Sequence, residues 1–230
     1  MPKLSKRARA NQSNLAAAPM DAPQAFTHLK KFKAPRFDQS VEVAMNLGVD
    51  VKQADQMIRG SVSLPKGIGK AKRVIAFCAS DIAPKALEAG AIKAGAEDLM
   101  AEVEAGFFDF DVAIASPDMM RVIAKLGRVL GPKGLMPSPK NGTVTPNVVD
   151  AVAEFAAGKV EYRTDKGGNI HAVIGKMSFP EADLVENFQH FLATIEKARP
   201  SSTKGEYIKR ITVSGTMTPG VQIRYQSAAV

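Results

Sequence analysis

The residues best suited to chemistry lie between Leu126 and Thr143, in the sequence LGRVLGPKGLMPSPKNGT. This stretch holds four glycines, three prolines and three cations, and no acid occurs between Asp118 and Asp150. Glycine and proline at this density disfavour a regular element and predict a shaped loop with free backbone N–H groups. Such groups beside cations suit a phosphate-bearing partner, and a solvated basic loop is the alternative.

A second set of residues combines cations with an aromatic ring and hydroxyl groups, which is the chemistry of an RNA surface. Lys and Arg neutralise phosphates, a Phe ring stacks on a base, and hydroxyls contact a 2′-OH. The candidates are Arg36, Phe37, Glu42, Arg163, Lys166, His171, Lys176, Ser214, Thr216 and Met217. Structural explanations compete with this one: Phe37 as a core residue, His171 as a packed or capping residue, and Thr216-Met217 as a simple turn.

The distribution of charge favours a nucleic-acid partner for the outer parts of the chain. The net charge is +8, from 31 basic and 23 acidic residues. Residues 67–158 contribute 10 basic and 11 acidic residues, so the positive charge lies entirely in 1–66 and 159–230. A basic excess confined to one part of a chain indicates a polyanion-binding part rather than a generally basic surface.

Composition disfavours several other classes of site. The single cysteine, Cys78, lies in the apolar run VIAFCA, so no disulfide framework is expected and the thiol should be buried. The three histidines show no ligand spacing. GIGK at 67–70 precedes an apolar strand, whereas a phosphate loop follows one. No apolar run approaches the ~20 residues of a membrane span. We expect a cytoplasmic protein without metal, cofactor or membrane association.

The elements that would position the RNA candidates are strands in the outer parts of the chain. We expect a basic, disordered arm over 1–20 and a helix over 23–31 with Asp21 as its cap. Alternating apolar residues predict strands over 37–47 and 58–64, and glycines predict a turn and hinge over 65–70. Further strands are expected over 160–163, 170–174, 207–213 and 221–225, the first two flanking a hairpin turn at 165–168. Between them, Ser178 and Glu181 suggest a capping box for a helix that ends near Lys197.

The middle of the chain alternates strands with helices. Strands are expected over 74–79 and 112–115, and helices over 84–93, 119–126 and 148–157. This order predicts a doubly wound α/β domain over 67–158, inserted into an outer α+β sandwich formed by 1–66 and 159–230. Gly67 and Gly158 at the two crossings are the expected hinges.

Five segments resemble the bacterial large-subunit ribosomal protein L-one family, the protein of the mobile stalk beside the tRNA exit site. The fullest match is LGRVLGPKGLMPSPKNGTVT, and the other four are RFDQSVEVAMNLGVD, RGSVSLPKGIGK, EYRTDKGGNIHAVIGKMSF and GTMTPGVQI. They occur in the family's order from Arg36 to Ile223. The resemblance implies the same two-domain architecture and a non-enzymatic role, with a nucleotide-dependent enzyme using the α/β insert as the alternative.

The resemblance also implies site residues and partners. Its rRNA contacts carry over to Arg36, Phe37, Ser40, Glu42, Thr216 and Met217. Gly215 and Thr218 depart from the family's Ser-Thr-Met-Gly-Pro loop, and Arg210 replaces a common Ser, where it adds or displaces a phosphate contact. The family's distal domain meets tRNA at the exit site, which implies a tRNA-facing surface of Arg121, Lys125, Arg128, Lys133 and Lys140. The implied partners are large-subunit rRNA, exit-site tRNA, the rest of the ribosome and the protein's own mRNA.

Overall fold

The computed structural model describes residues 5–16, 18–53 and 55–225 of the chain. The chain divides into two compact units, which are Met1–Gly69 with Val160–Val230 and Lys70–Lys159. We call them the outer unit and the inserted unit. Their boundaries lie within three residues of the domain limits expected from the sequence.

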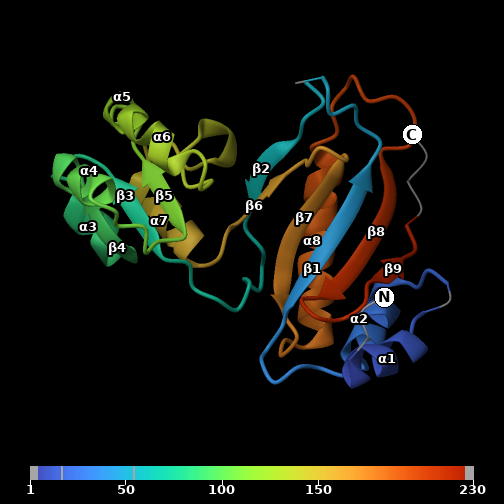
Figure 1. The fold of residues 1–230 in the computed structure, drawn as a ribbon. Helices are drawn as coiled ribbons and strands as arrows, with labels where there is room; N and C mark the ends of the chain where they lie inside the picture. The colour runs from blue at the N-terminus through green and yellow to red at the C-terminus, as the bar shows by residue number, and fades with distance from the viewer. Residues whose placement is uncertain (1–4, 17, 54, 226–230) are drawn as a thin grey trace. The chain divides into compact units, whose positions relative to one another are not determined.

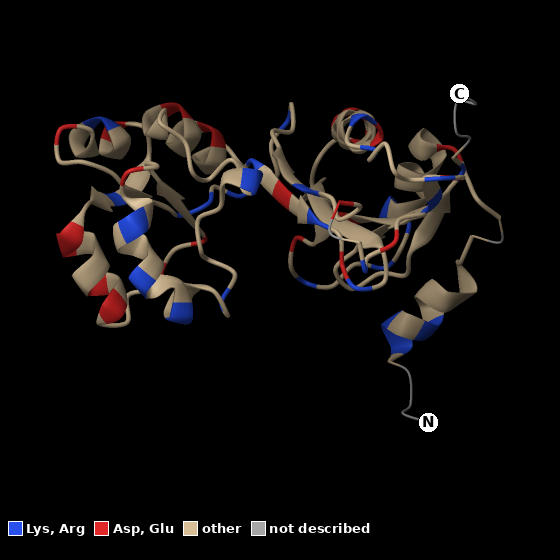
Figure 2. Ribbon diagram, turned by 90° about the horizontal axis from the view of Figure 1, so that it is seen from above, with Lys and Arg blue, Asp and Glu red and all other residues tan. Residues whose placement is uncertain are grey.

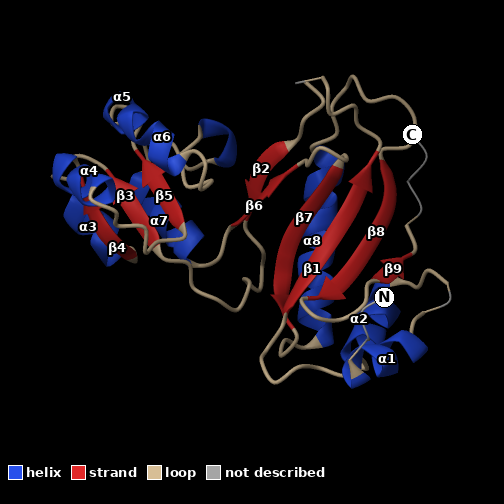
Figure 3. Ribbon diagram, viewed as in Figure 1, coloured by secondary structure: helices blue, strands red, loops and turns tan. Residues whose placement is uncertain are grey.

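A four-stranded antiparallel sheet forms the centre of the outer unit (Figure 1). Its strands are β1 (Ser40–Leu47), β7 (Asn169–Lys176), β8 (Ile208–Gly215) and β9 (Val221–Ile223), in the order β7-β1-β8-β9. Every second residue of β1 is buried, because one face packs against helices α2 (Ala22–Lys30) and α8 (Glu181–Lys197). No helix covers the opposite face in the described chain, and we call it the open face (Figure 3).

Two further strands of the outer unit lie next to the crossings into the inserted unit. β2 (Arg59–Val62) precedes the insertion and β6 (Val160–Arg163) follows it, and the two pair antiparallel. Tyr162 of β6 packs edge-on against Phe191 of α8, with 5.8 Å between the ring centroids. The two-stranded sheet is therefore part of the same hydrophobic core as the four-stranded sheet.

The inserted unit is a three-layer α/β structure. Its parallel strands are β3 (Val74–Phe77), β4 (Ala91–Gly95) and β5 (Val112–Ala115), in the order β4-β3-β5. Alternate residues of β3 enter different cores, one with α3 (Ala83–Glu88) and α7 (Val148–Ala156) and the other with α4 (Glu97–Glu104), α5 (Met120–Ile123) and α6 (Gly127–Leu130). Together with the α+β outer unit, these layers confirm the predicted fold class.

Several predicted elements of the inserted unit are wrong. The helix expected over 84–93 ends at Glu88, and 91–95 form β4, because Gly90 takes a φ of +108° that ends the helix. Helix α4 was not predicted. The glycine-rich stretch is more regular than its composition suggested, since Gly127–Leu130 form α6 and Pro139–Asn141 form a 3₁₀ helix. Leu126 and Leu130 are fully buried and hold α6 against the core.

In the outer unit, the segment predicted to be a disordered basic arm over 1–20 contains a helix within its described residues. Lys6–Ser13 form helix α1, whose cap is Ser5: its Oγ accepts from the Ala8 N–H at 3.1 Å. The strand expected from Phe37 begins at Ser40. Asp21 occupies the N-cap of α2 without a side-chain capping bond.

The other two corrections concern turns. Ser178 does not cap α8, because its Oγ donates to Asp38 at 2.8 Å and Pro180 is the N-cap residue. The turn expected at 165–168 is present and is closed by the antiparallel Thr164–Ile170 bridge, but β6 and β7 belong to different sheets and do not pair along their length.

Candidate RNA-binding site

The open face of the outer unit carries the polar side chains of β1. Because Val41, Val43, Met45 and Leu47 fill the core, the intervening residues of the strand point to the open face. These outward residues are Ser40, Glu42, Ala44 and Asn46. The sequence pattern of one strand therefore fixes a row of hydrogen-bonding groups along the middle of the face.

The register of the neighbouring strands places partners on both sides of this row. Glu42 lies between Val173 of β7 and Ser214 of β8, and Ala44 lies between His171 and Thr212. Asn46 is aligned with Asn169 and Arg210, and its Nδ2 donates to Asn169 Oδ1 at 2.8 Å. A depression on this surface is lined by Ala44, Asn46, Asn169, His171, Lys209, Arg210 and Thr212. Amide, hydroxyl and cationic groups in one depression can hydrogen-bond to base edges and neutralise a phosphate.

Three loops meet at the end of the sheet where β1 begins, and Gln39 joins them. Gln39 is 1% exposed, its Oε1 accepts from the Met217 N–H at 2.8 Å, and its carbonyl accepts from the Met177 N–H at 2.9 Å. The Ser40 carbonyl accepts from the Thr216 N–H at 3.1 Å, and Lys176 Nζ donates to Ser40 Oγ at 2.9 Å. The loop that contains Met217 is thus fixed against the start of β1.

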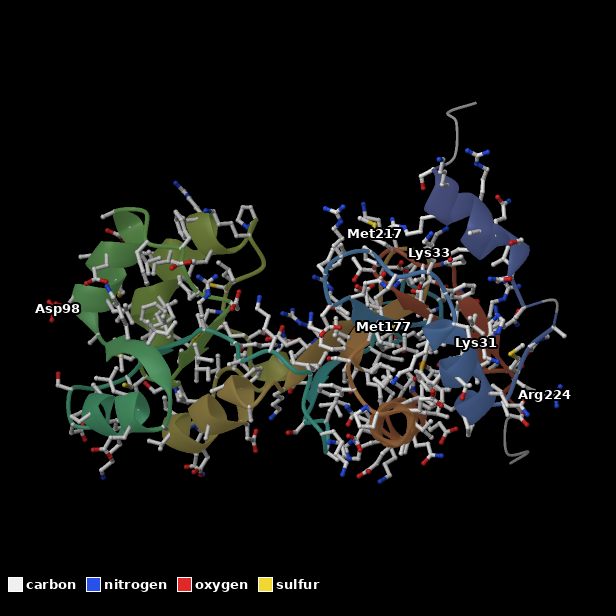
Figure 4. All side chains as sticks on the ribbon, turned by 90° about the horizontal axis from the view of Figure 1, so that it is seen from below. Lys31, Lys33, Asp98, Met177, Met217 and Arg224 are labelled. Carbon is white, nitrogen blue, oxygen red and sulfur yellow. The ribbon has the colours of Figure 1, made fainter. Side chains whose placement is uncertain are left out.

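Two large apolar side chains are exposed at this same end. The exposed fractions are 51% for Phe37 and 54% for Met217, which Figure 4 labels. The core explanation of Phe37 therefore fails. An exposed ring and a polarisable thioether next to ordered hydrogen-bonding groups provide stacking surfaces for unpaired bases.

The remaining outer-unit candidates lie toward the opposite end of the sheet. The Asp165 carboxylate accepts from the N–H groups of Gly167 and Asn169 at 2.8 and 2.7 Å. These bonds, that of Asn169 above all, hold the pKa of Asp165 below its ordinary value. The turn places His171 Nε2 3.7 Å from Asp165. Arg163 and Lys166 line a second depression with Val51 and Met57.

The structure therefore brings eight candidates to one end of the open face and places the others along it or beyond it. The group of eight comprises Arg36, Phe37, Ser40, Glu42, Lys176, Ser214, Thr216 and Met217. Gln39, Asn46, Asn169, Lys209 and Thr212 were not predicted. The alternation in β1 contains the signal for Asn46, whereas the others depend on pairing between strands more than 100 residues apart.

The basic candidates of the inserted unit form an exposed series on consecutive short elements. Arg121 lies on α5, Arg128 on α6, and Lys140 on the 3₁₀ turn Pro139–Asn141, while Lys125 and Lys133 lie between or after these turns. No ion pair engages these five cations among the residues that the structure describes. Lys133 Nζ lies 3.2 Å from the centroid of the Phe108 ring, so one cation already stacks on an aromatic face.

The two expected hinge glycines have local structural reasons for their positive φ angles. Gly67 has a φ of +62°, and its carbonyl accepts from Asn187 Nδ2 at 3.0 Å. Asn187 is fully buried in α8 and also accepts from the Lys66 N–H, which fixes the first crossing to the outer unit. Gly158 has a φ of +106° and follows the C-cap of α7. Their hinge role stays a prediction.

No metal site occurs in the described residues, 5–225 apart from 17 and 54. Within them, no group of three His, Cys, Asp or Glu side chains could hold a metal ion. No helix in these segments is long and apolar enough to cross a membrane. Cys78 is fully buried, and this burial raises the pKa of its thiol.

The chain is similar in sequence to known ribosomal proteins. The model of the ribosomal protein L1p/L10e family matches residues 29–219. The large ribosomal subunit protein uL1 of Neisseria meningitidis serogroup C (strain 053442) is 53% identical over 224 residues, which cover 97% of each chain. The protein of the same name from Neisseria gonorrhoeae (strain NCCP11945) has the same identity and coverage. This chain therefore belongs to the ribosomal protein L1p/L10e family.

Proposed function

We propose that the protein is a structural component of the large ribosomal subunit that binds rRNA through the open face of its outer unit. The observation that carries this proposal is the pair of exposed apolar side chains, Phe37 and Met217, at the end of the sheet where the row of polar groups on β1 begins. The buried Gln39 accepts from the Met217 N–H and holds that loop in place. The similarity to relatives named as large ribosomal subunit proteins supports the assembly to which it belongs. A non-enzymatic role in cytoplasmic ribosomes follows from this proposal.

Each group at this end of the face has a chemical role in the proposal. Phe37 and Met217 stack on bases that are not paired within the RNA. Arg36 and Lys176 neutralise phosphates, and Lys176 is already directed by its bond to Ser40. Glu42 and Ser214, side by side on β1 and β8, accept from a 2′-OH or a base amine.

The proposal extends to two further RNAs. The exposed cations of the inserted unit contact deacylated tRNA at the exit site and assist its release, because they lie on one continuous segment and have no ion pair among the described residues. The protein's own mRNA binds the same open face when it presents a fold like that of the rRNA site, and this binding represses translation. Both roles rest on the family's behaviour and on the chemistry of these surfaces.

The test substitutes the two exposed side chains and compares two RNAs. Phe37→Ala and Met217→Ala should each weaken binding to the rRNA segment of the stalk by about five- to hundredfold, the range for loss of one base stack. Binding to an unrelated RNA of equal length should change little, because phosphate contacts remain. Leu87→Ala, at a 46% exposed apolar position of the inserted unit, is the matched control. Equal losses on both RNAs would show that neither residue reads the rRNA.

A further inference from the structure

Helix α1 is an element whose own sequence stabilises it only through the Ser5 cap. It has eight residues, KRARANQS, and its only apolar side chains are those of Ala8 and Ala10. Isolated helices shorter than about 12 residues are marginal in water, and Lys6, Arg7 and Arg9 place cations at the helix N-terminus, where they oppose the helix dipole. Packing of an apolar face cannot explain why this segment is helical.

A single buried polar residue docks α1 on the outer unit. Asn11 is 2% exposed, its Nδ2 donates to the Lys33 carbonyl at 3.2 Å, and its Oδ1 accepts from the Lys33 N–H at 2.8 Å. A second contact joins the end of the helix to α2, since His28 Nε2 lies 2.9 Å from the Asn14 carbonyl. These bonds orient α1 and leave Lys6 and Arg9 in solvent.

The position of α1 relates it to the open face. In Figures 1 and 2, α1 projects on the side of the sheet opposite to α8, next to the end where β1 begins. Figure 4 shows Met217 and Lys33 on this same side, near the blue helix. A molecule that lies on the open face and contacts Met217 therefore passes the side chains of α1.

The exposed charges at this corner are mostly positive. Exposed Lys31, Lys33 and Arg36 follow α2 and extend the basic series of α1 toward β1. Within the described chain, none of these residues and none of the α1 cations has an acidic partner. The nearby Asp38 is engaged by the N–H and the hydroxyl of Ser178. A docked helix that has no apolar face and no acidic residue is suited to present cations to the phosphate backbone of a bound RNA.

We infer that α1 is a phosphate-binding wall beside the open face, which Asn11 holds in place and which contacts the backbone of the RNA bound there. This inference rests on the proposed function, because it requires RNA on the open face. Phosphate contacts of the α1 wall increase the affinity for RNA and the salt dependence of binding without distinguishing RNA sequences. Phe37 and Met217 supply the selectivity for one RNA over another.

The experiment compares two variants of the full chain that lose the same charge. Lys6→Gln/Arg9→Gln removes two cations from α1, and Lys197→Gln/Lys204→Gln removes two exposed cations from the last turn of α8 and the loop after it. Each is titrated with the stalk rRNA segment and with an unrelated RNA at several salt concentrations. The α1 variant should bind the rRNA about tenfold more weakly at low salt, with a salt slope reduced by about two. Its preference for the rRNA should persist, and the α8 variant should match the intact protein.

A further variant tests the docking itself. Asn11→Ala keeps every cation and removes both bonds to Lys33, and we expect it to weaken rRNA binding in the same direction. Equal affinity and slope for Lys6→Gln/Arg9→Gln and the intact protein would overturn the inference, as would unchanged binding by Asn11→Ala. The inference would also be overturned if Lys6→Gln/Arg9→Gln bound the rRNA like the intact protein but was retained less by vesicles of anionic phospholipid. That result would assign α1 to a membrane surface. If the intact protein shows no preference for the stalk rRNA, the proposed function itself fails.

Discussion

At the scale of single residues, the loop of Met217 is shaped by a complementary pair. Thr218 Oγ1 accepts from the Gly215 N–H at 2.8 Å, and the Thr218 N–H donates to the Gly215 carbonyl at 3.1 Å. A Cβ on residue 215 would lie 3.0 Å from this hydroxyl and 3.4 Å from Gln39 Oε1. The two departures from the family's usual loop therefore depend on each other: a threonine at 218 folds over residue 215 and requires a glycine there.

This dependence predicts coupled substitutions. Gly215→Ala alone should reduce the free energy of unfolding by about 1–3 kcal/mol, because the methyl group is forced against Thr218 and Gln39. The same change in a Thr218→Gly background should be better tolerated, with a coupling energy of about 1 kcal/mol. Urea unfolding of the four members of the cycle measures it, and additive effects would show that the pair does not interact.

Residue types identified the candidates at this end of the sheet but not the residue that holds them together. Phe37 and Thr216 have side chains that can contact RNA, and the resemblance to the family adds Met217. Gln39 is not recognisable from the sequence, because its role arises from bonds to residues more than 130 positions away. Whether Phe37 is buried or exposed is likewise a property of the folded unit.

At the scale of elements, α8 is the helix on which the outer unit depends. Its buried residues Leu184, Phe188, Phe191 and Ile195 repeat at helical spacing and cover the sheet. Asn187 on the same helix bonds to the carbonyls of Gly67 and Ile174, at 3.0 and 2.8 Å. One helix thus joins the apolar core, the strand β7 and the first crossing.

Truncation of one side chain in α8 should destabilise the outer unit without destabilising the inserted unit. Phe191→Ala should lower the stability of the outer unit by about 3–5 kcal/mol, since it opens a cavity next to Tyr162. Leu192→Ala, at the adjacent half-buried position, is the control and should have a smaller effect. In urea, only the transition of the outer unit should move, because the inserted unit has its own cores. A common shift of all signals would mean that the units unfold together.

Elements with a strong periodic pattern were predicted, and those without one were missed. β1 alternates over eight residues, and α8 has an apolar stripe over 17, so their existence follows from the sequence. β4 was missed because Ala91–Gly95 is short and follows directly on helix-forming residues. α1 was missed because it has no apolar stripe, and its only local signal is the Ser5 cap.

At the scale of the whole molecule, the two units divide the proposed work. The open face and α1 belong to residues before and after the insertion, whereas the exposed basic series from Arg121 to Lys140 belongs to the inserted unit. Each unit buries its own core, so neither needs the other for its hydrophobic stabilisation.

Excision of the inserted unit should therefore separate the two activities. A chain in which a short Gly-Ser linker replaces residues 70–159 should keep its affinity for the stalk rRNA within about threefold, because the phosphate and base contacts remain. Its contact with deacylated tRNA should be lost, as measured by crosslinking on ribosomes reconstituted with each chain. Loss of the preference for the stalk rRNA after excision would show that the residues that recognise this RNA lie in the inserted unit instead.

The order of strands also has a consequence for synthesis. β1 is made early, yet both of its neighbours, β7 and β8, follow the insertion. At about 5–20 residues per second, roughly ten to thirty seconds separate the translation of β1 from that of β8. During this interval the inserted unit, whose segments are contiguous, is able to fold alone. A nascent or prematurely terminated chain therefore lacks the surface proposed to bind RNA, and on this proposal only a nearly finished protein competes for RNA.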